Sequence, residues 1–130
     1  MSAHVIDRLR AAALSLLLIV AFVSPAFAGG DPVAGEKLYS RCQGCHSIDV
    51  NRVGPRHQGL FGRQAGSLDD YNYSDAMKAS GVGWDETPLD QFLAAPREFI
   101  KGTKMPFAGM KDAGERADLI AYLKQATAVP

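Results

Sequence analysis

The feature that most constrains how this chain can fold is the motif Cys42-Gln43-Gly44-Cys45-His46, which holds both cysteines of the 130-residue sequence. Two thiols with this spacing can bond to two points on one edge of a flat cofactor. The histidine that follows can place its Nε2 atom on a metal ion at the cofactor's centre. This C-x-x-C-H pattern is typical of covalent attachment of c-type haem, with His46 as the proximal iron ligand.

Three other uses of the motif remain open at this point. A redox-active C-x-x-C is usually set near a βαβ pattern, and the sequence shows no such pattern. A zinc site could recruit Cys42, Cys45, His46 and His57, although adjacent Cys45 and His46 point badly for tetrahedral closure. A plain structural disulfide would leave His46 unexplained.

Residues 1–28 have the pattern of an export signal. Arg8 and Arg10 form a basic start, residues 11–23 form an apolar run, and Ala26-Phe27-Ala28 offers small residues at a cleavage site. The apolar run would reach only about 20 Å as a helix, short of a hydrocarbon core of about 30 Å. We therefore expect cleavage after Ala28, a single domain over residues 29–130, and a periplasmic destination in a bacterial cell.

Composition excludes several classes of protein. The sequence has 14 basic and 14 acidic residues, and removal of Asp7, Arg8 and Arg10 with the leader leaves a net charge of −1. This balance argues against nucleic-acid binding. Two cysteines cannot build a multi-disulfide scaffold, and 47% hydrophobic with 22% charged residues is far from the composition of disordered chains.

Capping residues predict an all-α domain with four to five short helices and long loops. The expected helices span residues 31–41, 75–80, 88–95 and 112–126, with Thr87-Pro88 capping the third. The stretch 48–73 is rich in glycine and reads as irregular, and no segment alternates as a strand. Because so few short helices make a thin core, a large buried cofactor would help to hold the domain together.

A second axial ligand can be chosen from His57, Met77, Met105 and Met110. Met105 lies in Gly102-Thr103-Lys104-Met105-Pro106-Phe107, an irregular loop that can approach iron from the side opposite His46. Ligation by histidine and methionine raises the reduction potential relative to two histidines. It also fills both axial positions, which favours electron transfer over oxygen chemistry.

The mature chain resembles class I cytochromes c of the mitochondrial and soluble bacterial types. The resemblance covers nearly all of residues 29–126. It rests on CQGCH at 42–46, GLFGR at 59–63, the stretch 71–73, Trp84, GTKMPFAG at 102–109 and DLIAYLK at 118–124. It implies a cytochrome c fold around one covalent haem, in which the N- and C-terminal helices cross where Gly35 and Tyr39 meet Leu119 and Tyr122.

The same resemblance implies a role for each site residue. Cys42 and Cys45 would form the thioethers, His46 and Met105 would be the axial ligands, and the Pro55 carbonyl would accept the second ring N–H of His46. The other cofactor-binding positions implied are Arg63, Tyr73, Trp84 and Thr103 at a haem propionate and Phe107 over the haem edge. A buried propionate needs such partners because an unpaired buried carboxylate costs several kcal/mol.

Two positions depart from the mitochondrial pattern on the methionine side. Phe92 stands where that pattern has a tyrosine, and Met77 stands where it has an asparagine. Both changes make the pocket drier and less polar. The hydrogen-bond network described for the family therefore does not carry over to this chain unchanged.

The function implied is a periplasmic electron carrier, not an enzyme, with one covalent haem c and no small-molecule substrate. We expect a monomer that exchanges electrons with redox proteins such as a reductase, an oxidase or a dehydrogenase. A dedicated haem subunit of a larger oxidoreductase, or a membrane-anchored carrier, is the alternative. Acidic residues gather at Asp69, Asp70, Asp75, Asp85, Glu86 and Asp90, whereas Lys37, Arg41, Lys101, Lys104 and Lys111 flank the haem motifs, which predicts a dipole that steers partners.

Overall fold

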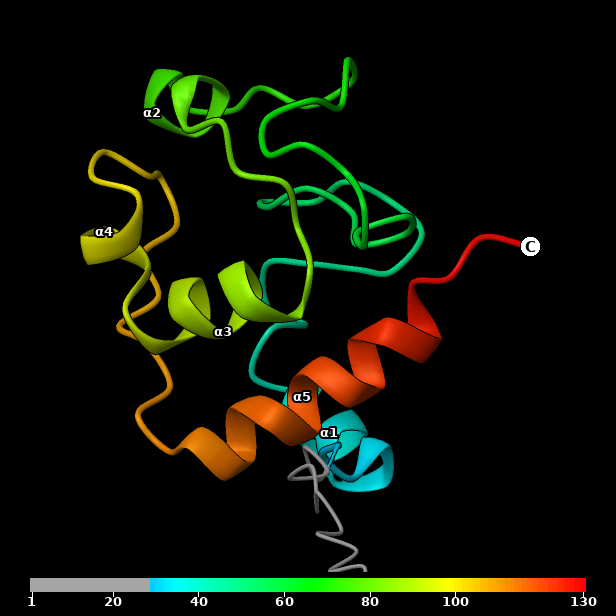
Figure 1. The fold of residues 1–130 in the computed structure, drawn as a ribbon. Coiled ribbons are helices and arrows are strands. Elements are labelled where there is room, and N and C mark those ends of the chain that lie inside the picture. Colours follow the sequence, from blue (N-terminus) through cyan, green and yellow to red (C-terminus); the bar gives the residue numbers. More distant parts are fainter. Residues whose placement is uncertain (1–28) are drawn as a thin grey trace, which may run out of the picture.

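The computed structural model describes residues 29–130, and in that range the chain forms helices joined by long loops (Figure 1). The helices are α1 (Pro32–Tyr39), α2 (Asp75–Ala79), α3 (Glu86–Ala94), α4 (Pro96–Phe99) and α5 (Ala113–Ala126). The only sheet-like pairing in this part of the chain is an isolated bridge between Gln64 and Gly83. The all-α prediction is confirmed, and the expected export signal lies outside the described residues.

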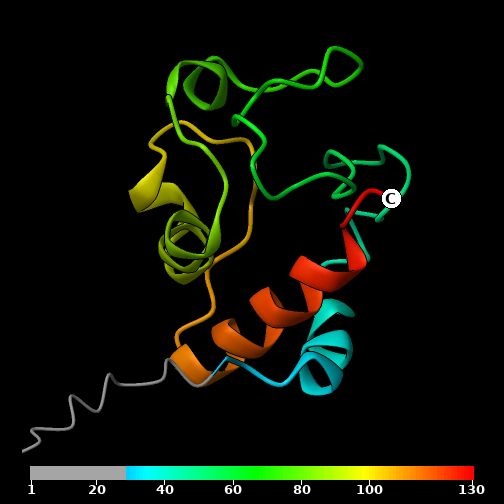
Figure 2. The same cartoon turned by 45° about the vertical axis from the view of Figure 1, so that its right-hand side comes forward.

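Helices α1 and α5, at the two ends of the described chain, lie side by side in both views (Figures 1 and 2). A Cβ atom on Gly35 would sit 2.0 Å from the Asp118 carbonyl oxygen, so only glycine permits this approach. The Asp31 backbone N–H also donates to the Asp118 carboxylate at 2.7 Å. The structure thus contains the predicted crossing, with Tyr39 and Leu119 buried in it.

Most helix starts agree with the predicted caps, and α3 is the exception. Asp31, Ser74 and Asp112 each accept a backbone N–H in the first turn of their helices, as expected. For α3 the capping side chain is Asp85, which accepts the Thr87 N–H at 2.9 Å, so the helix begins two residues before the predicted Pro88. Proline is tolerated there because the N–H groups of a first turn have no helical partner to lose.

Helix α4 has no counterpart among the helices predicted from capping residues. Pro96 was expected only to end the preceding helix, and α3 does end at Ala94. The same proline also occupies the first position of α4, where its fixed φ angle suits a helix start. One residue therefore both stops a helix and starts the next.

The long loops before α2 are held together by side chains as well as by backbone turns. The Asn51 amide donates to the Asp70 carbonyl at 3.0 Å and accepts the Arg56 N–H at 2.9 Å. The Arg56 guanidinium donates to both carboxylate oxygens of Asp70, at 2.8 and 2.6 Å. The Tyr71 hydroxyl donates to the Val53 carbonyl at 2.6 Å. We call these residues (51, 53, 56, 70 and 71) the loop clamp.

None of the helices within residues 29–130 combines the length and the apolar character needed to span a bilayer.

Candidate cofactor site

A cavity of about 500 Å³ lies among the loops, α3 and α5. Its walls are mainly apolar, with contributions from Leu60, Leu89, Leu93, Leu119 and Leu123. Every residue predicted for the site from the sequence lines this one cavity: Cys42, Cys45, His46, Arg63, Tyr73, Trp84, Thr103, Met105 and Phe107. The structure therefore brings together groups that are spread over most of the described chain.

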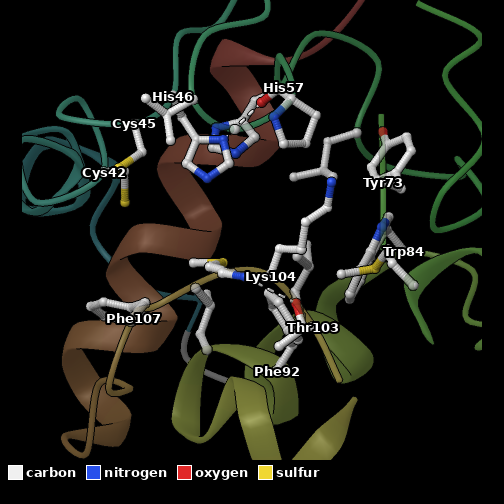
Figure 3. A pocket seen from close by; sticks show the side chains of 18 of the residues that line it. Cys42, Cys45, His46, His57, Tyr73, Trp84, Phe92, Thr103, Lys104 and Phe107 are labelled. Atoms are coloured by element: carbon white, nitrogen blue, oxygen red, sulfur yellow. Dashed lines mark hydrogen bonds between the residues drawn. The ribbon is translucent and has the colours of Figure 1, made fainter. Parts of the chain in front are cut away.

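These groups are divided between the walls of the cavity. Figure 3 shows the two cysteines and His46 along one side, with His57 beside them. Thr103 and Phe107 lie on the opposite side, on the loop that also carries Met105, and Tyr73 and Trp84 lie together at a third edge. A flat group placed between the two opposite sides would meet an imidazole from one side and the methionine loop from the other.

The C-x-x-C-H motif forms a compact turn that continues directly from α1. The Cys42 N–H donates to the Tyr39 carbonyl at 2.8 Å, and both the Cys45 and the His46 N–H groups donate to the Cys42 carbonyl, at 3.0 and 2.9 Å. This winding brings the two thiols and the imidazole to the same cavity. The end of α1 thus fixes where the motif lies.

The His46 ring is held in the orientation that a metal ligand needs. Its Nδ1 atom lies 2.7 Å from the Pro55 carbonyl oxygen, which can only accept, so Nδ1 carries the hydrogen and Nε2 keeps its lone pair. Burial lowers the pKa of His46, which favours this neutral form. A Cβ atom on Gly54 would lie 2.3 Å from His46 Cε1, so the backbone also closes tightly against the ring.

The surroundings of Cys42 do not favour its use in a redox-active C-x-x-C pair. Burial raises the pKa of Cys42 to about 11, whereas disulfide exchange depends on a thiol with a lowered pKa. Cys42 and Cys45 are not bonded to each other. Within residues 29–130, no three His, Cys, Asp or Glu side chains converge in a way that could hold a metal ion.

The methionine side of the cavity is apolar, as the sequence led us to expect. Phe92 is buried at 6% exposure and packs against Trp84 with ring centroids 5.2 Å apart. Met77 lines the same cavity. The loop itself is held by the Met105 N–H, which donates to the Thr103 hydroxyl at 3.3 Å, and by the Lys104 ammonium, which donates to the Asn72 carbonyl.

Hydrogen-bond donors gather at the edge formed by Arg63, Tyr73 and Trp84. The Arg63 guanidinium donates to the carbonyls of Gln58 and Arg56, at 3.0 and 3.1 Å. Burial lowers the pKa of Arg63 and raises that of Tyr73, so the phenol stays protonated. An arginine, a phenol and an indole at one edge of an apolar cavity suit an acidic substituent.

The residues present therefore fit a haem: an apolar cavity, two thiols, an imidazole, a thioether and donors for acidic groups. When bound, haem would supply the one-electron chemistry of its iron, and the protein groups would hold it and set its potential.

His57 has a place in the site that the sequence did not indicate. The sequence marks it only as a possible ligand, yet its ring stacks on His46 with centroids 4.3 Å apart and planes at 22°. Its Nδ1 atom lies 3.0 Å from the Tyr39 hydroxyl. No spacing pattern links Tyr39 to His57, so only the folded chain could reveal this pair.

Comparisons with known proteins agree with the geometry. The model of the cytochrome c family matches residues 32–127. The chain is 46% identical over 101 residues to cytochrome c2 of Rhodomicrobium vannielii, with 75% of this chain and 81% of that protein covered. It is 43% identical over 120 residues to cytochrome c2 of Blastochloris viridis, with 90% and 94% covered. The solved structure of cytochrome cH from Methylobacterium extorquens is similar with a TM-score of 0.72 and 46% identity, over 74% of this chain and 99% of that one.

The fold, the cavity and these matches define a haem protein of the electron-transfer class. The chain belongs to the cytochrome c family, carries covalent haem c, and is an electron carrier rather than an enzyme.

Proposed function

We propose that this protein is an exported, periplasmic carrier of single electrons with one haem bound through Cys42 and Cys45. His46 and Met105 would be the axial iron ligands. The observation that carries the proposal is the 2.7 Å hydrogen bond from His46 Nδ1 to the Pro55 carbonyl. It leaves Nε2 as the only ring nitrogen free to bind iron, in a cavity that Met105 also lines.

The remaining residues of the cavity have distinct tasks in this proposal. Each Cys42 and Cys45 thiol would add its S–H across one haem vinyl group to form a thioether. Arg63, Tyr73, Trp84 and Thr103 would bind a propionate. Phe107 would cover the haem edge near Met105 and keep water from the iron.

Export of the chain is supported by its leader. Residues 1–28 have a basic start, a short apolar run and an A-x-A site. The match to the Blastochloris viridis protein covers 90% of this chain, more than residues 29–130 contain, so it extends into the leader. We propose cleavage after Ala28 and a monomer that docks transiently on other redox proteins.

A redox titration followed by optical spectroscopy tests the haem and its ligands. The full chain, expressed with its own leader, should yield a covalent c-type spectrum in a periplasmic extract. Met105→Leu should keep the covalent haem but lower the midpoint potential by on the order of 100 mV or more, because axial ligands set haem potentials over a wide range.

Met110→Leu is the matched control, since Met110 is buried outside the cavity. It should leave the potential of the wild-type protein unchanged. Equal potentials in Met105→Leu and the wild type would contradict the assignment of Met105 as a ligand. Absence of covalent haem from the wild-type extract would contradict the whole proposal.

Export and assembly need separate measurements. The mass of the purified protein should correspond to residues 29–130 plus one haem, and gel filtration should give the size of a monomer. A retained leader would indicate an anchored carrier, and co-elution with other chains would indicate a subunit of a larger oxidoreductase.

A further inference from the structure

Two histidines lie stacked against each other at the wall of the haem cavity. The ring centroids of His46 and His57 are 4.3 Å apart, and their planes differ by only 22°. Figure 3 shows the two rings together on the cysteine side of the cavity. His57 also lines the cavity, so its ring is part of the surroundings of the haem and not only of the protein core.

The orientation of the His57 ring is set by a hydrogen bond to Tyr39. The Tyr39 hydroxyl lies 3.0 Å from His57 Nδ1, and Tyr39 is only 2% exposed. Burial raises the pKa of Tyr39 to about 12, so the phenol keeps its proton and donates it. Because the phenol donates, Nδ1 of His57 is the acceptor and Nε2 carries the ring hydrogen.

Tyr39 is itself firmly placed, because it is the last residue of α1 and packs in the crossing with α5. Its ring lies 5.4 Å from that of Tyr122 and 5.7 Å from that of His57, centroid to centroid. A continuous series of contacts therefore runs from the helix crossing through Tyr39 and His57 to His46.

These contacts add to the restraints that Pro55 and Gly54 place on His46. The Pro55 hydrogen bond fixes the tautomer, and the Gly54 backbone closes against the ring near Cε1. A second ring stacked on the His46 ring further opposes a change in the plane of the imidazole. The backbone strengthens the restraint, since the His57 N–H donates at 3.0 Å to the carbonyl of Ser47, the residue directly after His46.

We propose that Tyr39 and His57 are a pair of positioning residues that fix the plane of the His46 imidazole relative to the haem. Tyr39 holds the His57 ring through its hydroxyl, and His57 holds the His46 ring by stacking. The inference rests on the proposed role of His46 as an iron ligand. It adds a restraint on the ligand plane to the restraint that Pro55 places on the tautomer.

The ligand plane can be measured directly by NMR of the oxidised holoprotein. The pattern of haem-methyl proton shifts in Fe(III) haem depends on the orientation of the axial imidazole plane. Tyr39→Phe removes only the hydroxyl, and we expect it to change the order or the spread of these resonances while the covalent haem is retained. In the wild type, nitrogen-15 shifts of His57 should show hydrogen on Nε2 and none on Nδ1.

The chain offers a matched control in Tyr122→Phe, which removes a hydroxyl from the same aromatic cluster without touching His57. It should leave the haem-methyl pattern as in the wild type. His57→Phe keeps a ring but leaves the Tyr39 hydroxyl without its partner. The double variant Tyr39→Phe/His57→Phe removes that unpaired hydroxyl, so it should recover folding stability while its haem-methyl pattern stays altered.

Two results would overturn the inference. One is a haem-methyl pattern in Tyr39→Phe and in the double variant that matches the wild type. The other is a His57 ring in the wild type with hydrogen on Nδ1. Failure of the proposed function would look different, because the wild-type protein would then lack histidine-ligated haem before any comparison of variants began.

Discussion

Phe92 and Met77 contribute apolar side chains, with no hydroxyl or amide, to the cavity that Met105 also lines. Phe92 is buried, with its ring centroid 5.2 Å from that of Trp84 in a tilted contact and 6.4 Å from that of Phe99 in an edge-on contact. The iron centre carries more positive charge when oxidised, and an apolar wall offers that charge little stabilisation. These two residues should therefore raise the reduction potential.

Phe92→Tyr tests this effect by adding one hydroxyl to the apolar wall. We expect the midpoint potential to change by about 20–60 mV, the electrochemical equivalent of one net hydrogen-bond energy of about 0.5–1.5 kcal/mol. Phe99→Tyr is the control, because Phe99 packs on Phe92 without lining the cavity. An unchanged potential in Phe92→Tyr, measured by optical redox titration, would show that this position does not tune the iron.

At the residue scale, the groups predicted from recognisable motifs line one cavity in the structure. Cys42, Cys45 and His46 are adjacent in the chain, and Met105 stands in a loop marked by glycine and proline. The partnership of Tyr39 with His57 could not be predicted, because it depends on how α1 lies relative to a loop 18 residues away. Ring stacking leaves no periodic trace in the sequence.

At the scale of elements, capping chemistry predicted where most helices begin, and competition between caps explains the errors. Asp85 and Thr87 both have side chains suited to an N-cap, and the proline after Thr87 made the later position look preferable. The structure uses Asp85, so that Pro88 still falls within the first turn. The four-residue α4 was missed because it is too short to show periodicity.

The loop clamp is the element whose strength should depend on pH. The hydrogen bonds from the Arg56 guanidinium hold the pKa of the Asp70 carboxyl below its ordinary value. A carboxyl with a lowered folded-state pKa stabilises the protein above its unfolded pKa of about 4. That contribution is lost as the pH falls through the folded-state value. Asp70→Asn should remove this acid-dependent part of the free energy of unfolding.

Hydrogen exchange at the Arg56 amide measures the clamp locally, because this N–H donates to Asn51. We expect faster exchange in Asp70→Asn than in the wild type at pH 7, and a smaller difference at pH 3. Asp75→Asn is the control, since its carboxyl pKa is lowered by Lys78 within a single helix. If the Arg56 amide exchanges equally fast in Asp70→Asn and in the wild type at pH 7, the ion pair between Arg56 and Asp70 does not stabilise the loop clamp.

At the scale of the whole molecule, folding reduces the charge separation that the sequence suggests. In the sequence, only Lys78 stands among the clustered acidic residues. In the structure, Asp70 pairs with Arg56, Glu86 with Lys124 and Asp90 with Arg116, and on the basic side Arg41 pairs with Glu115. Lys104 lines the haem cavity and donates to a backbone carbonyl instead of a carboxylate. Its charge is therefore a better candidate for steering a partner than the charge of Arg41, which is paired with Glu115.

Lys104→Glu should slow electron exchange with an anionic reagent such as ferricyanide, by on the order of 10-fold at low ionic strength, without altering the optical spectrum. Added salt should shrink the difference, because charges more than about 10 Å apart are screened at 0.1 M. Lys124→Glu makes the same change in net charge outside the cavity lining and should have the smaller effect. Stopped-flow rates that are insensitive to both Lys104→Glu and salt would rule out steering.

The crossing of α1 and α5 also has a consequence for the order in which the molecule is assembled. The Asp31 to Asp118 contact joins residues 87 positions apart, so the fold cannot close until the last helix has been synthesised. In the proposed export, with the N-terminus leading, Cys42 and Cys45 would cross the membrane long before α5. Both thiols would then stay accessible for haem attachment until α5 arrives and the crossing with α1 can form.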